Sequence, residues 1–311
     1  MKKINLCQKI VLILISSSIT FCGCRTNTVS NTASEPIAIS SETENTTEPE
    51  IPSSSEKKQG IVVTIPNFYS PQLNTEHNVL RIYLPPNYEK SNKSYPVVYM
   101  PDGQNLFSSS TATYGKSWLL GNLLDRLAKE GRTDGIIVVG IDSTARRNEE
   151  YNLYLDSFYG DGEGLANETC DFYVETVKEY IDENYRTLPD KEHTAIIGAS
   201  YGAVVSFNAT VRYSDVFGYV GMFSYCDNQD SAKMTTFLKE NMIPDSLSEH
   251  YIYFFTAKYD FARQSTYSAY TIAEENGLKH IILEEDENGQ HDEYSWGPAF
   301  ENCLDFFGWL Q

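Results

Sequence analysis

The chain after about residue 59 alternates between two hydrophobic patterns. Short apolar runs rich in Val, Ile and aromatic residues are separated by longer segments in which apolar residues recur every three or four positions. The short runs are typical of buried strands, and the longer segments are typical of amphipathic helices. Strands are predicted at 62–67, 79–85, 96–101, 135–142, 193–199, 219–225, 251–257 and 280–285, and helices at 117–130, 170–185, 201–213, 232–242, 265–277 and 294–310.

This alternation predicts the fold class. Strands that alternate with helices pair in a largely parallel sheet covered on both faces. We therefore expect a three-layer α/β domain over residues 59–311, with a mostly parallel eight-stranded sheet and helices on both sides. In such sheets, reactive groups gather beyond the carboxyl ends of the strands.

The N-terminal segment is predicted to export the protein. Three lysines precede the apolar run 10–20, which is shorter than a membrane span requires. The run ends in FCGC at 21–24, which resembles the lipobox of bacterial lipoproteins and implies removal of residues 1–23 and lipid on Cys24. Phe21 departs from the more usual Leu, so an ordinary cleaved signal or an uncleaved anchor stays an alternative. Either route takes the protein out of the cytoplasm, and a lipid would attach it to the membrane at the cell surface.

The composition of the chain indicates a linker and excludes one class of partner. Residues 24–58 are rich in Ser, Thr, Asn, Glu and Pro and contain no aromatic residue, which is typical of a disordered linker. The 311-residue chain has a formal net charge of -19, so nucleic acid is not an expected partner, because a phosphate backbone needs a basic surface. The sequence does not determine the oligomeric state.

The cysteines give no sign of a metal site. Of the six, Cys7 and Cys22 lie in the leader and Cys24 would carry the lipid, which leaves Cys170, Cys226 and Cys303 in the domain. An odd number cannot all pair, and whether any two pair stays open. No CxxC pair or Cys/His spacing of the zinc type occurs. We therefore expect no metal and no cofactor.

Ser200 is the candidate nucleophile. It stands in Gly198-Ala199-Ser200-Tyr201-Gly202, where the predicted strand 193–199 ends and the predicted helix begins. A serine exposed on a sharp strand-to-helix turn needs neighbours without side chains, which explains Gly198 and Gly202.

The serine requires a base, and His291 is the candidate. A serine hydroxyl becomes a good nucleophile when a histidine takes its proton and a carboxylate orients that histidine. Of the five histidines, four precede strand candidates, and His291 alone follows the carboxyl end of one, in the loop after the last strand.

The acid is predicted to be Asp260. It follows the strand 251–257 after three residues and stands between Tyr259 and Phe261. Asp227, just past the strand 219–225, is the alternative. The acidic run at 284–287 is interpreted as a solvated loop edge.

Backbone amides are expected to bind the negative charge that develops on an attacked carbonyl oxygen. One is the N–H of Tyr201, at the start of the helix. The second is predicted in the sharp turn after the strand 96–101, at Gln104 with Gly103.

Four stretches of the chain resemble a known enzyme family. These stretches, residues 95–107, 170–203, 255–262 and 289–300, are similar to the family of α/β-hydrolases that includes esterase D, enterochelin esterases, feruloyl and acetyl xylan esterases, and the mycolyltransferases. The resemblance implies an α/β-hydrolase fold and a triad that falls on Ser200, Asp260 and His291. The chain departs from the family at Pro101, where His is more usual, and at Ala203, where a second Gly is more usual.

The resemblance also indicates a substrate region. Residues 145–168 correspond to a segment near the pocket of the family, where Arg147 and Tyr151 are expected to contact substrate, together with Trp296 near the base. A solvated insert is the alternative for the distal half of that segment. Its run GDGEG at 160–164 lacks the context of a dinucleotide or calcium site.

The sequence therefore predicts a surface-anchored serine esterase that acts on a small-molecule or carbohydrate ester. Export favours an acylated or feruloylated polysaccharide, or a siderophore ester, because such esters are too large or too charged to import. Acyl transfer by the same fold and a non-catalytic glycan-binding protein are the two alternatives.

Overall fold

A computed structural model describes residues 59–155, 162–227 and 231–311. The chain divides into two units, residues 1–57 and 58–311. The predicted leader, Cys24 and the linker lie outside the described residues.

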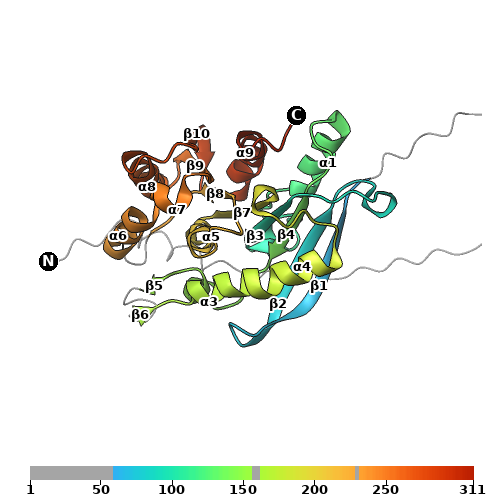
Figure 1. The fold of residues 1–311 in the computed structure, drawn as a ribbon, viewed down its shortest axis with the longest axis horizontal. Coiled ribbons are helices and arrows are strands. Elements are labelled where there is room, and N and C mark those ends of the chain that lie inside the picture. Colours follow the sequence, from blue (N-terminus) through green and yellow to red (C-terminus); the bar gives the residue numbers. More distant parts are fainter. Residues whose placement is uncertain (1–58, 156–161, 228–230) are drawn as a thin grey trace, which may run out of the picture. The chain divides into compact units, whose positions relative to one another are not determined.

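An eight-stranded sheet forms the centre of the domain (Figure 1). Its strand order is β1-β2-β4-β3-β7-β8-β9-β10. β1 pairs antiparallel to β2, and β2 pairs antiparallel to β4, whereas the other neighbours are parallel. The strands are β1 (Ile61–Ser70), β2 (Thr75–Leu84), β3 (Val97–Pro101), β4 (Ile137–Ile141), β7 (Thr194–Ala199), β8 (Tyr219–Phe223), β9 (Tyr251–Tyr259) and β10 (Ile281–Gln290), and β5 (Tyr154–Leu155) and β6 (Gly162–Glu163) pair separately.

Helices cover both faces of the sheet, as predicted. α1 and α9 share one apolar core with one face, and the segment from α3 to α4, α5, α6 and α8 share a second core with the other face. No helix within the described residues is long and apolar enough to cross a membrane. The helices are α1 (Leu120–Glu130), α2 (Arg147–Glu150), α3 (Ala166–Asp171), a π-helix (Phe172–Lys178), α4 (Glu179–Asn184), α5 (Tyr201–Arg212), α6 (Ser231–Asn241), α7 (Pro244–Leu247), α8 (Arg263–Glu275) and α9 (Glu293–Phe306), with 3₁₀ turns at Tyr88–Lys90, Gly103–Asn105 and Lys191–His193.

The acidic run at 284–287 is not a loop edge, which corrects the prediction from the sequence. β10 continues through the run to Gln290. Glu285 accepts hydrogen bonds from Arg263 Nε (2.9 Å) and Tyr267 Oη (2.6 Å), and Glu284 accepts one from Asn302 Nδ2 (2.9 Å). Side chains from α8 and α9 therefore keep these carboxylates in an edge strand, and a short window of sequence contains none of these partners.

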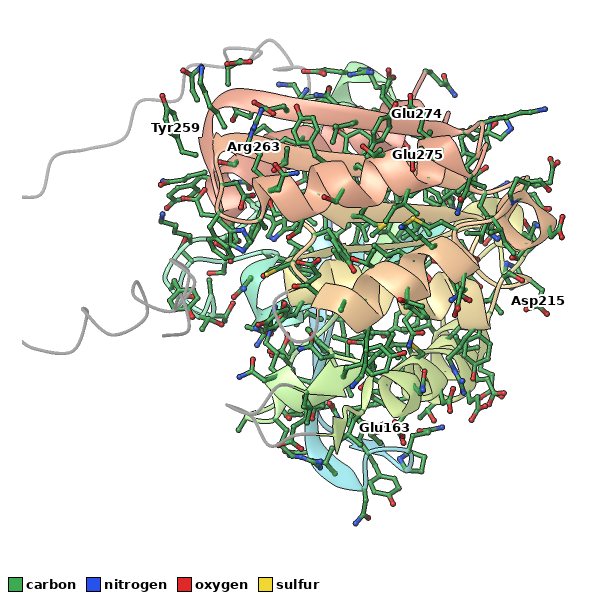
Figure 2. The ribbon with its side chains drawn as sticks, turned by 90° about the vertical axis from the view of Figure 1, so that its left-hand side faces the viewer. Glu163, Asp215, Tyr259, Arg263, Glu274 and Glu275 are labelled. Atoms are coloured by element: carbon green, nitrogen blue, oxygen red, sulfur yellow. The ribbon has the colours of Figure 1, made fainter. Side chains whose placement is uncertain are left out.

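The parallel strands bring the ends of β7, β8 and β9 together. Ala199 pairs with Phe223, and Phe223 pairs with Phe255. Figure 2 shows Tyr259, the last residue of β9, and Arg263 on one side of the molecule, while Asp215, in the loop before β8, lies toward the other. The residues that follow these strands therefore share one edge of the sheet.

The three cysteines of the domain, Cys170, Cys226 and Cys303, are buried, and no disulfide joins any two of them. The question that the sequence left open is thereby answered for the described residues: they form no disulfide with one another.

Candidate active site

Ser200 lies alone between β7 and α5 in an unusual backbone conformation. Its φ of 59° and ψ of -127° fall outside the regions that side chains favour, and its N–H donates to the Phe223 carbonyl at 2.9 Å. Gly198 is required here, because a Cβ at that position would lie 2.2 Å from the Gly202 carbonyl oxygen. This is the strained strand-to-helix turn that the sequence predicts, and such turns project the serine hydroxyl above the sheet.

The structure brings Asp260 and His291 together. His291 Nδ1 lies 2.8 Å from Asp260 Oδ1, which also accepts the Ala262 N–H at 2.7 Å. Burial alone would raise the pKa of Asp260, whose side chain is 0% exposed, but the hydrogen bonds from its neighbours, His291 first, hold the pKa below its usual value. Because an ionised carboxylate can only accept, Nδ1 of a neutral His291 carries the proton and Nε2 is left as the acceptor.

Asp227, the alternative acid, has a different partner. Its Oδ1 accepts from Ser265 Oγ at 2.6 Å, on the face that α8 covers. The other three described histidine side chains have other partners: His193 contacts Asp190, His250 contacts the Ser214 carbonyl, and His280 stacks on Tyr251. Of the two candidate acids, Asp260 is therefore the one that pairs with His291.

Two aromatic rings enclose the His291 imidazole. Phe261 stacks on it with ring centroids 4.0 Å apart, and Trp296 meets it edge-on at 5.1 Å. Trp296 is only 6% exposed, and its Nε1–H donates to Ser224 Oγ at 2.7 Å. The indole is therefore mostly buried against the imidazole, and its contact with substrate stays a prediction.

Gly103 and Gln104 lie in the 3₁₀ turn after β3, beside the Ser200 turn. A Cβ at Gly103 would lie 2.5 Å from the Gly140 carbonyl carbon, so only glycine allows this turn to approach β4 so closely. The Gln104 side chain donates to Ser143 Oγ (3.0 Å) and accepts the Ser143 N–H (3.1 Å). A Cβ at Gly202, in the first turn of α5, would lie 3.2 Å from the Pro101 ring. The end of β3, directly before the turn that carries Gly103 and Gln104, therefore packs against the helix that begins at Tyr201.

Arg147 and Tyr151 support this turn through Asp102. Asp102 has a left-handed backbone (φ 59°), and its carboxylate receives Arg147 Nε at 2.7 Å and Arg147 Nη2 at 2.6 Å. Its N–H donates to Tyr151 Oη at 3.0 Å, and Tyr151 is 1% exposed. Tyr151 is therefore buried beneath this turn and the Arg147 guanidinium is paired with the Asp102 carboxylate, while the expected contacts of both residues with substrate stay predictions. Residues 156–161 of the predicted substrate segment lie outside the described residues.

Side chains next to His291 tie its loop to the rest of the site, and the sequence reasoning missed them. Asp292 caps α9 by accepting the Ser295 N–H and pairs with Lys116 Nζ at 2.6 Å. Glu293 accepts from Asn105 Nδ2 at 3.0 Å, which joins α9 to the 3₁₀ turn at Gly103–Asn105. Their adjacency to His291 was the signal in the sequence that could have indicated them. Their partners Asn105 and Lys116 lie more than 170 residues away in the chain, so the contacts could not be predicted locally.

A known family matches most of this domain. The family described as "Putative esterase" matches residues 70–302. The chain belongs to this esterase family. Membership agrees with the enzyme class expected from the sequence, and the sheet with helices on both faces confirms the predicted α/β-hydrolase fold.

Curated relatives share a part of this esterase. An endo-1,4-beta-xylanase/feruloyl esterase from Xylanibacter ruminicola is 30% identical over 148 residues, which are 46% of this chain and 19% of that protein. The uncharacterized protein YbbA of Bacillus subtilis is 26% identical over 147 residues, 46% of this chain and 54% of that protein. The match thus spans about half or less of the length of these two relatives.

Solved structures of esterases share the fold. A ferulic acid esterase superposes with a TM-score of 0.64 at 23% identity, covering 80% of this chain and 98% of that one. An IroE-like serine hydrolase from Shewanella oneidensis superposes with a TM-score of 0.66 at 19% identity, covering 80% of both chains. At these identities the likeness establishes the fold, and the fold agrees with the family.

Proposed function

We propose that this esterase is a serine hydrolase in which Ser200, His291 and Asp260 form the catalytic triad. The observation that carries the proposal is the 2.8 Å contact between His291 and Asp260, at the same edge of the sheet as the strained turn of Ser200. Nucleophile, acid and base follow one another along the chain as Ser200, Asp260 and His291, which is the order that α/β-hydrolases use.

The proposed reaction proceeds through an acyl-enzyme. His291 Nε2 accepts the Ser200 hydroxyl proton while Oγ bonds to the ester carbonyl carbon, and the proton then passes to the departing alcohol. Water next attacks the acyl-enzyme, gives its proton to His291, and releases the acid as Ser200 regains a proton. The N–H groups of Tyr201 and Gln104, with Gly103, are assigned to the negative charge on the carbonyl oxygen.

The proposed substrate is an acylated or feruloylated carbohydrate, or a siderophore ester. The feruloyl esterase relative and the ferulic acid esterase fold support the first, and an enterobactin esterase from Shigella flexneri with the same fold, with a TM-score of 0.59, supports the second. Export, with lipid on Cys24 as the membrane anchor, is supported by the charge and apolar pattern of residues 1–24.

Substitution of Ser200 tests the proposal. We expect Ser200→Ala to remove hydrolysis of p-nitrophenyl acetate and labelling by a fluorophosphonate probe, because no other group bonds to the acyl carbon. Ser268→Ala is the matched control, since Ser268 lies exposed on α8 and bonds the Gln264 carbonyl of its own helix. Retained labelling in Ser200→Ala would refute the assignment. A panel of acetylated, feruloylated and siderophore esters then separates the substrate classes.

A further inference from the structure

Ser224 lies at the edge of the sheet beside the proposed triad, in a strained conformation of its own. It follows β8 directly, is 0% exposed, and has a φ of 49°. Its N–H donates to the Phe255 carbonyl at 2.7 Å, so the backbone is fixed against β9. A left-handed serine is uncommon, and such strain persists where the surroundings enforce it.

The Trp296 indole determines the direction in which the Ser224 hydroxyl can donate its proton. Trp296 Nε1–H donates to Ser224 Oγ at 2.7 Å. A hydroxyl has one proton to give and accepts through its lone pairs, so Ser224 keeps its own proton for another acceptor. The Asp260 carboxylate is the acceptor that this arrangement offers: burial raises the pKa of Asp260, and the side chains of His291 and Ser224 lower it, which indicates that the Ser224 hydroxyl is close to this carboxylate.

One oxygen of the Asp260 carboxylate can still accept a hydrogen bond. Its Oδ1 already receives both His291 Nδ1 and the Ala262 N–H. Its Oδ2 is buried and has no hydrogen-bond partner among the residues that the structure describes. Burial raises the pKa of Asp260, and the side chains of His291 and Ser224 together with the Ala262 amide outweigh that effect. A buried carboxylate oxygen left without a donor is costly, and more so when the group is charged.

We propose that Ser224 is a positioning residue of the Asp260–His291 pair: its hydroxyl, oriented by Trp296, donates to Asp260 Oδ2. Trp296 then acts on both partners, through its ring on His291 and through Ser224 on Asp260. The inference rests on the proposed triad, and it assigns to Ser224 and Trp296 the task of keeping the acid ionised and the base in place.

The experiment compares Ser224→Ala, Ser224→Gly and Trp296→Phe in p-nitrophenyl acetate hydrolysis across pH. Glycine adopts a positive φ without strain, so Ser224→Gly removes the hydroxyl even if the alanine variant folds poorly. Trp296→Phe keeps a ring against His291 and removes the indole N–H. The matched control is Thr256→Val, because the Thr256 hydroxyl is equally buried on β9 and has no partner among the described residues.

We expect both Ser224 variants to lower kcat by about tenfold with an unchanged KM, the effect of one hydrogen bond to an ionised group. Loss of the donor leaves the ionised Asp260–His291 pair less well positioned for proton transfer, so activity on the acid side of the pH profile should be lost at a higher pH. Trp296→Phe should shift the profile in the same direction. Asp292 and Glu293 are the other carboxylates beside His291, and each substitution leaves them unchanged, so their charge does not account for a difference between the variants.

Two results would overturn the inference. An unchanged acid limb in both Ser224 variants, whether or not kcat falls, would reduce Ser224 to a structural role. An acid limb that stays in place in Trp296→Phe would show that the indole N–H does not orient the Ser224 hydroxyl. Failure of the proposed function is recognised separately, because it would appear as retained activity in Ser200→Ala.

Discussion

Asp260 and Asp227 follow neighbouring strands of one sheet, and their environments separate them. Asp260 is buried against His291, whereas Asp227 bonds Ser265 on α8. Chain order allows either residue to serve as the acid, so the choice depends on which carboxylate reaches the imidazole. The 2.8 Å contact selects Asp260 for the proposed triad.

Replacement of the two aspartates tests this choice. Asp260→Asn should lower kcat for p-nitrophenyl acetate by about three to four orders of magnitude, because an amide no longer favours the tautomer with the proton on Nδ1. Asp227→Asn is the matched control and should leave kcat/KM unchanged. The assignment is wrong if the two variants lose activity in the reverse order.

At the scale of elements, the 3₁₀ turn at Gly103–Asn105 depends on a charge pair. The Asp102 carboxylate would lie unpaired next to the proposed oxyanion donors if Arg147 did not neutralise it with two hydrogen bonds. A negative charge there opposes the negative charge that develops on the carbonyl oxygen. We therefore expect Arg147 to contribute to the proposed chemistry through Asp102.

Substitution of Arg147 measures this contribution. Arg147→Met should lower kcat by about tenfold, which corresponds to about 1.4 kcal/mol of transition-state stabilisation. Adding Asp102→Asn should recover part of the loss, because asparagine tolerates the left-handed backbone and carries no charge. Arg146→Met is the control, since Arg146 forms an exposed pair with Glu149 on its own helix. A double variant no better than Arg147→Met would contradict the charge argument.

The same elements explain how far the sequence could be interpreted. Strand ends and chain order locate Ser200, Asp260 and His291, because these positions follow from local patterns. The places of Tyr151 and Trp296 depend on partners distant in the chain, Asp102 and Ser224, which no local pattern reveals. Ser224 itself gives no signal, since a serine with a positive φ has no characteristic neighbours in sequence.

At the scale of the whole molecule, the described domain contains every residue of the proposed site. Residues 59–311 hold the sheet, both cores and the Asp260–His291 pair. The proposed chemistry therefore makes no demand on the leader or the linker. Their proposed role is to determine where the ester is hydrolysed.

Separating the anchor from the domain tests this division of roles. In a bacterial host, Cys24→Ala should move the protein from the membrane fraction to the soluble fraction, because the cysteine carries the proposed lipid. The purified fragment 59–311 should hydrolyse p-nitrophenyl acetate with the same kcat/KM as the full chain, since it contains every residue of the proposed site. Cys22→Ala is the control and should stay in the membrane fraction. Equal membrane retention of both cysteine variants would refute lipid attachment at Cys24 and favour an uncleaved apolar anchor, while the activity of the fragment would still report on the domain alone.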